Sequence, residues 1–277
     1  MTNQEKRIRV FETSMRLCRE EAALRAAVAA SCAGQRIIWQ EDEEPRWQPR
    51  FERPAARVVS GRRSFEAARA YAEAGKRVCV LNFASSVTPG GGVTYGSQAQ
   101  EESLCRVSTL YPALSDASAK PFYDRHWEMI RAGTMKRENR DDCIHTPGVI
   151  VLCEDDGEEA LLPAERRYTA DVITCAAPDL HAVDDGSRYA PTQEELLALL
   201  TRRWRRIMAV AAANGAEVLI LGAFGCGVFA NPPEMVVRAF EQAAEGVGRC
   251  FETIEFAVFA RADSPNRRAF EALRRGE

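Results

Sequence analysis

Short runs of apolar residues, each about the length of one strand, alternate along the chain with segments that have the residue pattern of helices. The expected strands are residues 77–84, 148–153, 171–176, 218–221 and 253–259. A strand whose residues are nearly all apolar is typical of a sheet covered by helices on both faces, because neither side of it meets water. This alternation predicts an α/β fold with helices packed on both sides of a largely buried sheet.

The intervals between these strands carry the expected helices. They cover about residues 4–33, 62–75, 98–112, 120–131, 192–214, 232–246 and 264–275. Prolines interrupt the region from 36 to 60, where only residues 57–59 have the character of a short strand. Because no repeat, low-complexity tract or linker divides the sequence, we expect one domain over residues 1–277. Residues 1–60 would form an N-terminal helical extension and residues 61–277 the α/β core.

Composition excludes several classes of function. The formal net charge is −3 and the isoelectric point about 5.8, so the chain lacks the strong positive field of proteins that bind duplex nucleic acid directly. No apolar stretch approaches the roughly 20 residues of a membrane span, and the N-terminus lacks the apolar core of a signal peptide. The nine cysteines form no Cys-x-x-Cys pair, which favours a reducing, cytoplasmic compartment.

Three consecutive glycines, Gly90, Gly91 and Gly92, follow the strand expected at 77–84. Without side chains, such residues let the backbone curl closely around a ligand. The segment ends in Glu101 and Glu102, two adjacent acids at the start of an expected helix. A glycine turn beside a pair of carboxylates suits a substrate that carries phosphate and requires acid–base chemistry.

A structural role for the two acids stays open. Ser97 and Gln100 fit a capping box, which places the acids in the first helical turn, where the helix dipole favours negative charge. Glu102 and Arg106 have the spacing of an i,i+4 ion pair. Both effects stabilise the ionised carboxylate, whereas burial and the neighbouring like charge would favour the protonated acid that catalysis needs.

A second glycine-rich turn, residues 222–227, lies between the strand at 218–221 and the next helix, for which Asn231 and Pro232 fit the cap and first position. Such a turn can present several backbone N–H groups to an anion. It has neither the Rossmann nor the P-loop spacing. Because each glycine turn follows a buried strand, we expect both at the edge of the sheet where open α/β folds bind ligands.

The segment from Gly90 to Glu102, with seven residues between the glycines and Gln100, resembles the signature of poly(ADP-ribose) glycohydrolases. The flanking segments at 82–84 and 104–106 are similar to the microbial-type branch of that family. Residues 222–232 are similar to its diphosphate loop. The resemblance covers roughly residues 5–260 and implies a macrodomain-like, three-layer α/β/α fold with a mixed sheet.

The resemblance also implies an activity, the hydrolysis of ribose–ribose O-glycosidic bonds in poly(ADP-ribose) with release of ADP-ribose. Glu102 would be the catalytic acid, and Glu101 would hold ribose hydroxyls beside it. The implied substrate-binding residues are Asn82, Gly90, Gly91, Gly92, Gln100, Gly225, Cys226, Gly227, Val228 and Phe229. Neither a metal nor a cofactor is implied. The partners would be poly(ADP-ribose), ADP-ribose and poly-ADP-ribosylated proteins, in the reversal of ADP-ribosylation during the DNA damage response.

Two other functions remain open from the sequence. The chain could be a macrodomain that binds ADP-ribose or removes single ADP-ribose units, or a nucleotide-sensing module whose acids only cap a helix. Metal catalysis is disfavoured because the three histidines, His126, His145 and His181, lack ligand spacing. The acidic run at 154–159 has the character of a solvated turn rather than a metal loop.

Overall fold

The computed structural model describes residues 1–181 and 189–275. Its sheet has seven strands among the described residues, in the order β1-β4-β5-β3-β6-β7-β2. The strands are β1 (Arg36–Ile38), β2 (Ala56–Ser60), β3 (Val78–Phe83), β4 (Cys143–Val151), β5 (Tyr168–Cys175), β6 (Val218–Leu221) and β7 (Thr253–Ala257). Pairing is antiparallel at β1–β4 and β4–β5 and parallel at the other four junctions. The mixed sheet confirms the predicted fold class.

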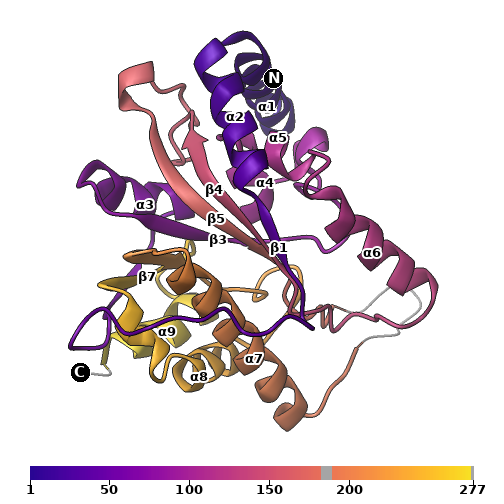
Figure 1. Ribbon diagram of the computed structural model, residues 1–277, viewed down its shortest axis with the longest axis vertical. Coiled ribbons are helices and arrows are strands. Elements are labelled where there is room, and N and C mark those ends of the chain that lie inside the picture. Colours follow the sequence, from indigo (N-terminus) through magenta and orange to yellow (C-terminus); the bar gives the residue numbers. More distant parts are fainter. Residues whose placement is uncertain (182–188, 276–277) are drawn as a thin grey trace.

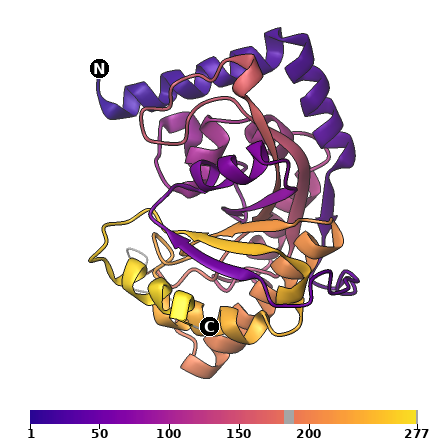
Figure 2. The ribbon, with the colours of Figure 1, turned by 90° about the vertical axis from the view of Figure 1, so that its left-hand side faces the viewer.

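Helices cover both faces of this sheet (Figure 1). They are α1 (Asn3–Glu20), α2 (Ala22–Gly34), α3 (Ser64–Glu73), α4 (Gln100–Arg106), α5 (Leu110–Leu114), α6 (Lys120–Arg131), α7 (Gln193–Ala213), α8 (Pro233–Ala243) and α9 (Pro265–Glu271). Figure 2 shows α7 to α9 gathered below the sheet and the N-terminal helices above it. No helix in the described part of the chain is long and apolar enough to cross a membrane.

Strand β3 shows why the fold has two hydrophobic cores. Its residues point alternately to opposite faces of the sheet. Cys79 and Leu81 pack into the core that contains residues of α7 and α8, whereas Val78 and Val80 pack into the core beneath α1, α3 and α4. Apolar residues at successive positions from Val78 to Leu81 are therefore needed to bury both faces of the strand, and the polar Asn82 follows them.

Two expected helices are each divided in the structure. The helix expected at 4–33 is two helices that meet at Glu21, whose backbone is extended and whose carboxylate binds Arg167 on the opposite side of the junction. The helix expected at 98–112 ends at Arg106 and resumes at Leu110. Between them Ser108 forms a β-bridge with Val151, a long-range contact that the local helical pattern does not reveal.

Residues before position 61 also contribute to the sheet. Strand β1 pairs with β4 at one edge, and β2, which contains the strand expected at 57–59, pairs in parallel with β7 at the other. The parallel strands β2, β7, β6, β3 and β5 all end at the same edge of the sheet. Because β3 and β6 are neighbours, the two glycine turns that follow them emerge side by side.

Candidate active site

A cavity of about 450 Å³ lies at this edge and is lined by both glycine turns. Gly91, Gln100, Glu101 and Glu102 line it from the first turn and α4, and Gly225, Gly227, Val228 and Phe229 line it from the second turn. Eight of the twelve predicted site residues therefore surround one space. The other four, Asn82, Gly90, Gly92 and Cys226, lie outside this lining.

Helix α4 begins later than the capping box predicted. Its cap residue is Ala99, not Ser97. The Ser97 amide donates to the Gly92 carbonyl at 3.2 Å, which ties Ser97 to the start of the short 3-10 turn at Val93–Tyr95 that precedes the helix. Glu101 and Glu102 still fall in the first turn of α4, as predicted, and both side chains are buried.

The two oxygens of Glu102 have different surroundings. Oε1 accepts a hydrogen bond of 2.9 Å from the Gly92 amide. Oε2 is buried and has no hydrogen-bond partner among the described residues. A carboxylate held by one oxygen, with the other free beside a cavity, is oriented to exchange a proton with a bound molecule.

The close approach of the backbone to these acids requires glycine at position 91. Gly91 has φ of +56°, in the left-handed region that side chains rarely adopt. A Cβ there would lie 2.4 Å from Glu102 Oε1 and 3.2 Å from Glu101 Oε2. The first glycine turn is thus packed directly against both carboxylates.

Glu101 is held from the opposite side. Its Oε2 accepts from the Ser85 amide at 2.7 Å and its Oε1 from the Asn82 side chain at 3.2 Å. Burial raises the pKa of Glu101 to about 8, aided by the charge of Glu102, although these two hydrogen bonds and the Gly90 amide act to lower it. Glu101 can therefore hold a proton near neutral pH, and Asn82 lies beneath it as a fully buried support.

Gln100 fastens α4 to the end of β3. Its amide nitrogen donates to the Leu81 carbonyl at 2.7 Å and to the Ser64 hydroxyl at 3.0 Å, while its oxygen accepts from the Phe83 amide at 2.9 Å. All three bonds are to the scaffold. Gln100 therefore sets the distance between the acids and the sheet.

The second glycine turn presents a row of amides. None of the hydrogen bonds among the described residues uses the amides of Gly227, Val228 or Phe229. Three successive free N–H groups form the kind of backbone concavity that binds phosphate. Phe229 lines the cavity beside them, whereas Phe224 is fully buried in the core against Trp204.

Asn231 does not cap α8, contrary to the sequence prediction, because the cap residue is Pro232. Its side-chain amide instead donates to the Pro178 carbonyl at 2.7 Å and to the Gly225 carbonyl at 3.1 Å. Asn231 therefore ties the second glycine turn to the segment that follows β5.

The acidic run at 154–159 is not simply a solvated turn. Glu159 is buried and pairs with Arg106, Oε1 to Nη2 at 2.5 Å, so the ion pair expected between Glu102 and Arg106 does not form. The contact of Arg106 with Glu102 is a hydrogen bond of 3.2 Å to the backbone carbonyl and does not involve the carboxylate. Asp155 is also buried, and it accepts from the Ser103 hydroxyl at 3.0 Å. This run therefore closes over the outer side of α4.

Sequence analysis missed part of the cavity wall, which includes Arg63, Ser64, Asp155, Phe259 and Asn266. The first two follow β2, and Phe259 follows β7, so all three lie where parallel strands end at the same edge. Residues 57–59, the expected short strand, were placed in an N-terminal extension outside the α/β core, so the end of that strand was not connected with the site. Arg63 stacks on the exposed ring of Phe259, with its guanidinium carbon 4.1 Å from the ring centroid.

The histidines are not arranged as metal ligands. His126 is buried and contacts Asp142, and His145 is buried 3.4 Å from Asp171. Within the described residues, no group of three or more His, Cys, Asp or Glu side chains is placed to hold a metal ion.

Comparison with known proteins links this geometry to one family. A family model described as the catalytic domain of microbial-type poly(ADP-ribose) glycohydrolase (PARG) matches residues 6–154. A search of curated protein sequences finds no match.

Solved structures match over most of the chain. The poly(ADP-ribose) glycohydrolase from Thermomonospora curvata is 30% identical over 98% of this chain and 99% of that one, with a TM-score of 0.83. With the inhibitor ADP-HPD bound, it is 28% identical over the same shares, with a TM-score of 0.80. The enzyme from Deinococcus radiodurans in complex with ADP-ribose is 35% identical over 89% of this chain and 98% of that one, with a TM-score of 0.74.

The close approach at Gly91 can be tested by Gly91→Ala, with Gly75→Ala as the matched control. Gly75 also has positive φ, +77°, but a Cβ added there would have no other atom within 4 Å. We expect the control to lose only the cost of left-handed strain, about 1 kcal/mol of unfolding free energy. Gly91→Ala should lose about 1 kcal/mol more, because a displaced Glu102 forfeits its bond to Gly92. Equal losses in urea unfolding would contradict the contact.

The raised pKa of Glu101 predicts a pH-dependent stability. Because the folded protein binds this proton more tightly than the unfolded chain, the stabilisation is complete below about pH 4.5 and is lost as pH rises toward 8. Glu101→Gln removes the titration and leaves only a constant offset. Relative to wild type, the variant should gain unfolding free energy between pH 5 and 8, on the order of a few kcal/mol. If the unfolding free energies of wild type and Glu101→Gln, measured in urea, changed with pH in the same way, the raised pKa of Glu101 would be refuted.

Proposed function

This chain belongs to the microbial-type poly(ADP-ribose) glycohydrolase family, and we propose that it cleaves its polymer in the cavity between the two glycine turns, with Glu102 as the catalytic acid. The activity is hydrolysis of the ribose–ribose O-glycosidic bond, and the product is ADP-ribose. The observation that carries the assignment of Glu102 is its buried Oε2, which has no partner among the described residues and belongs to a side chain that lines the cavity.

Binding would orient the substrate through its diphosphate. The amides of Gly227, Val228 and Phe229 offer donors to phosphate oxygens without a positively charged side chain. This suits a chain whose net charge is negative. With the diphosphate on the second turn, the terminal ribose would lie toward the first turn and its two acids, and Phe229 would pack beside that sugar.

Glu101 would fix the ribose by hydrogen bonds to its hydroxyls. Because burial raises the pKa of Glu101 to about 8, its carboxyl group can donate as well as accept hydrogen bonds near neutral pH. Its position depends on Asn82 and Ser85 on one side and on Gly91 on the other. Adjacent residues on a helix point about 100° apart, so the two acids address different parts of the sugar.

Glu102 would act twice. Its protonated Oε2 donates a proton to the glycosidic oxygen as the bond from that oxygen to the anomeric carbon breaks, so the departing ribose leaves with a hydroxyl group, which lowers the barrier to an oxocarbenium-like transition state. The resulting carboxylate then takes a proton from water, which attacks the anomeric carbon. The Gly92 amide holds Oε1 throughout, so the free oxygen keeps its direction.

We further propose that residues 1–277 form a single macrodomain-type catalytic domain. Residues 1–60 add two helices and two edge strands to the core at 61–277. The physiological substrates would be poly-ADP-ribosylated proteins, and the setting would be the DNA damage response in the cytoplasm. The nine free cysteines, seven of them buried, support a reducing compartment.

Glu102→Gln tests the catalytic role. We expect the turnover of labelled poly(ADP-ribose) to fall by about 10²- to 10⁴-fold, because glutamine cannot transfer the proton. Affinity for ADP-ribose, measured by calorimetry, should remain within a few fold. Glu234→Gln is the matched control, since Glu234 also lies in the first turn of a helix but is exposed and outside the cavity.

The same assay separates the other functions. Unchanged cleavage by Glu102→Gln would contradict the assigned role. Binding of ADP-ribose without polymer cleavage by wild type would indicate a reader, and release of ADP-ribose only from singly modified protein would indicate a mono-ADP-ribosyl hydrolase.

A further inference from the structure

Two neighbouring residues on α6 hold the loop that leads from β3 to the first glycine turn. His126 Nδ1 lies 3.0 Å from the Ser86 carbonyl, and Trp127 Nε1 donates to the Val87 carbonyl at 3.0 Å. Ser85, which precedes Ser86 and Val87 in this loop, supplies the amide that binds Glu101. Three consecutive backbone positions are thus fixed between α6 and the acid.

The ring of His126 faces an acceptor at each nitrogen. Nε2 lies 2.8 Å from Asp142 Oδ2, on the side of the ring away from the Ser86 carbonyl. A neutral imidazole has one N–H and can donate to only one of these oxygens, so both bonds form when the ring carries both protons. Burial would raise the pKa of Asp142, but the His126 contact, the Gln40 amide and Arg140 outweigh it and hold this pKa below its usual value. Asp142 is therefore a carboxylate that can accept a hydrogen bond from His126 Nε2.

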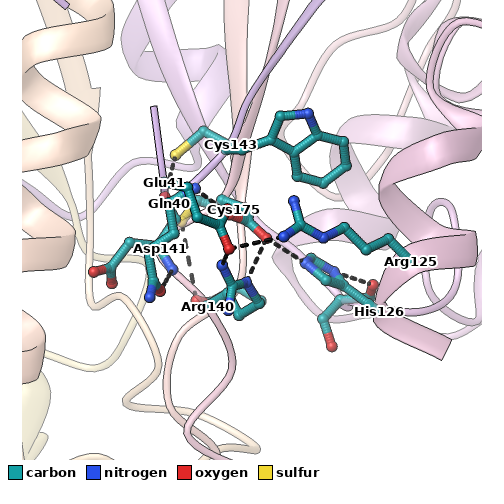
Figure 3. A network of polar contacts seen from close by, with 12 residues as sticks. Gln40, Glu41, Arg125, His126, Arg140, Asp141, Cys143 and Cys175 are labelled. Carbon is teal, nitrogen blue, oxygen red and sulfur yellow. Dashed lines mark hydrogen bonds and ion pairs between the residues drawn. The ribbon is translucent and has the colours of Figure 1, made fainter. Parts of the chain in front are cut away.

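The preceding residue in the chain, Asp141, binds two arginines of α7. It accepts from Arg203 Nε at 2.6 Å and from Arg202 Nε at 2.8 Å. Arg203 is fully buried and donates onward to the Ala176 carbonyl. Figure 3 shows Asp141 and His126 on opposite sides of this network, with Arg140 between them.

The segment after β5, residues 176–178, is the part of the chain against which the second glycine turn packs, and we call it the seat of that turn. Its three consecutive carbonyls each accept from a side chain: Ala176 from Arg203, Ala177 from Asn139 and Pro178 from Asn231. The fit to the turn is tight, because a Cβ at Gly225 would lie 2.7 Å from the Ala177 Cβ. The position of this segment therefore sets the position of the amides at 227–229.

We propose that the adjacent pair Asp141–Asp142 is a positioning centre that fixes the two substrate-binding turns relative to each other. The proposal rests on the function proposed above. Asp142 acts through His126 on the loop that orients Glu101, and Asp141 acts through Arg203 on the seat of the diphosphate-binding turn. Neither aspartate lines the cavity. Because the two are consecutive in the backbone, the acid side and the diphosphate side of the site share one anchor.

Isosteric replacements of His126 separate positioning from mere packing. The amide nitrogen of asparagine lies near the Nδ1 position and can donate to Ser86, whereas that of glutamine lies near Nε2 and can reach only Asp142. We expect kcat on poly(ADP-ribose) to be about tenfold lower for His126→Gln than for His126→Asn, with similar KM. Equal kcat values for the two variants would overturn the proposal.

Trp127→Phe is expected to keep the fold, because this residue is 46% exposed and phenylalanine retains an aromatic ring there while removing the N–H that donates to Val87. We expect kcat to fall about threefold with KM within twofold of wild type. Glu41→Gln is the control, since Glu41 binds Arg125 and Arg140 in the same network (Figure 3), has an exposed side chain and contacts neither turn. A Trp127→Phe enzyme as active as the control would contradict the role of α6.

The action of Asp141 through Arg203 on the second glycine turn is tested by ligand binding, which does not require cleavage. Asp141→Asn should weaken ADP-ribose binding in calorimetry by about tenfold relative to Glu41→Gln, because Arg203 loses its carboxylate and the seat of the second turn shifts. Equal affinities would overturn the proposal. A wild type that binds ADP-ribose but leaves the polymer intact would refute the proposed function, while this comparison would still decide whether Asp141 positions the second turn.

Discussion

The hydrogen bond from the Gly92 amide to Glu102 Oε1 is the interaction on which the site depends. It fixes one oxygen of the proposed catalytic acid and leaves the other without a hydrogen-bond partner among the described residues. The bond is possible only because Gly91 brings the backbone closer to both acids than any residue with a side chain could. Besides the substrate contact proposed for it, the glycine run therefore also orients the Glu102 carboxylate.

The rest of the fold keeps this contact in register with the second turn. Parallel pairing of β3 with β6 places the two turns side by side, and Gln100 fastens α4 to the end of β3. Buried polar pairs then hold the loops. Arg106 pairs with Glu159 outside α4, and in the second group Asp141 pairs with Arg203 and Asp142 with His126. Buried ion pairs are poor sources of net stability but define one geometry well. Their placement around the cavity is consistent with a requirement for precise loop positions.

Local pattern was sufficient for the five inner strands, β4, β5, β3, β6 and β7, and for both glycine turns, whereas the edge strand β1 was missed. Each strand is a short apolar run that must be buried, and a glycine turn after such a strand is visible in the sequence itself, as in the run from Val78 to Gly92. The edge at which β3 and β6 end then follows from α/β topology. These features depend on neighbours in the chain, so the sequence was enough to bring Glu102 and Phe229 to one cavity.

Contacts between distant residues could not be predicted in this way. Arg106 has an acid at the right helical spacing, yet it pairs with Glu159, which lies 53 positions away. Ser97 and Asn231 have the residue types of helix caps, but the Ser97 amide bonds back to Gly92 and the Asn231 side chain bonds to the distant Pro178 carbonyl. The side of the cavity formed by Arg63 and Phe259 was missed because it depends on strand β2, a short edge strand in a proline-rich region.

A crystal structure with ADP-ribose bound tests the central claim most directly. The account predicts diphosphate oxygens within about 3 Å of the amides at 227–229 and the terminal ribose beside Glu102, whose Oε1 still accepts from Gly92. A diphosphate bound elsewhere, or a Glu102 side chain turned away from the sugar, would contradict it.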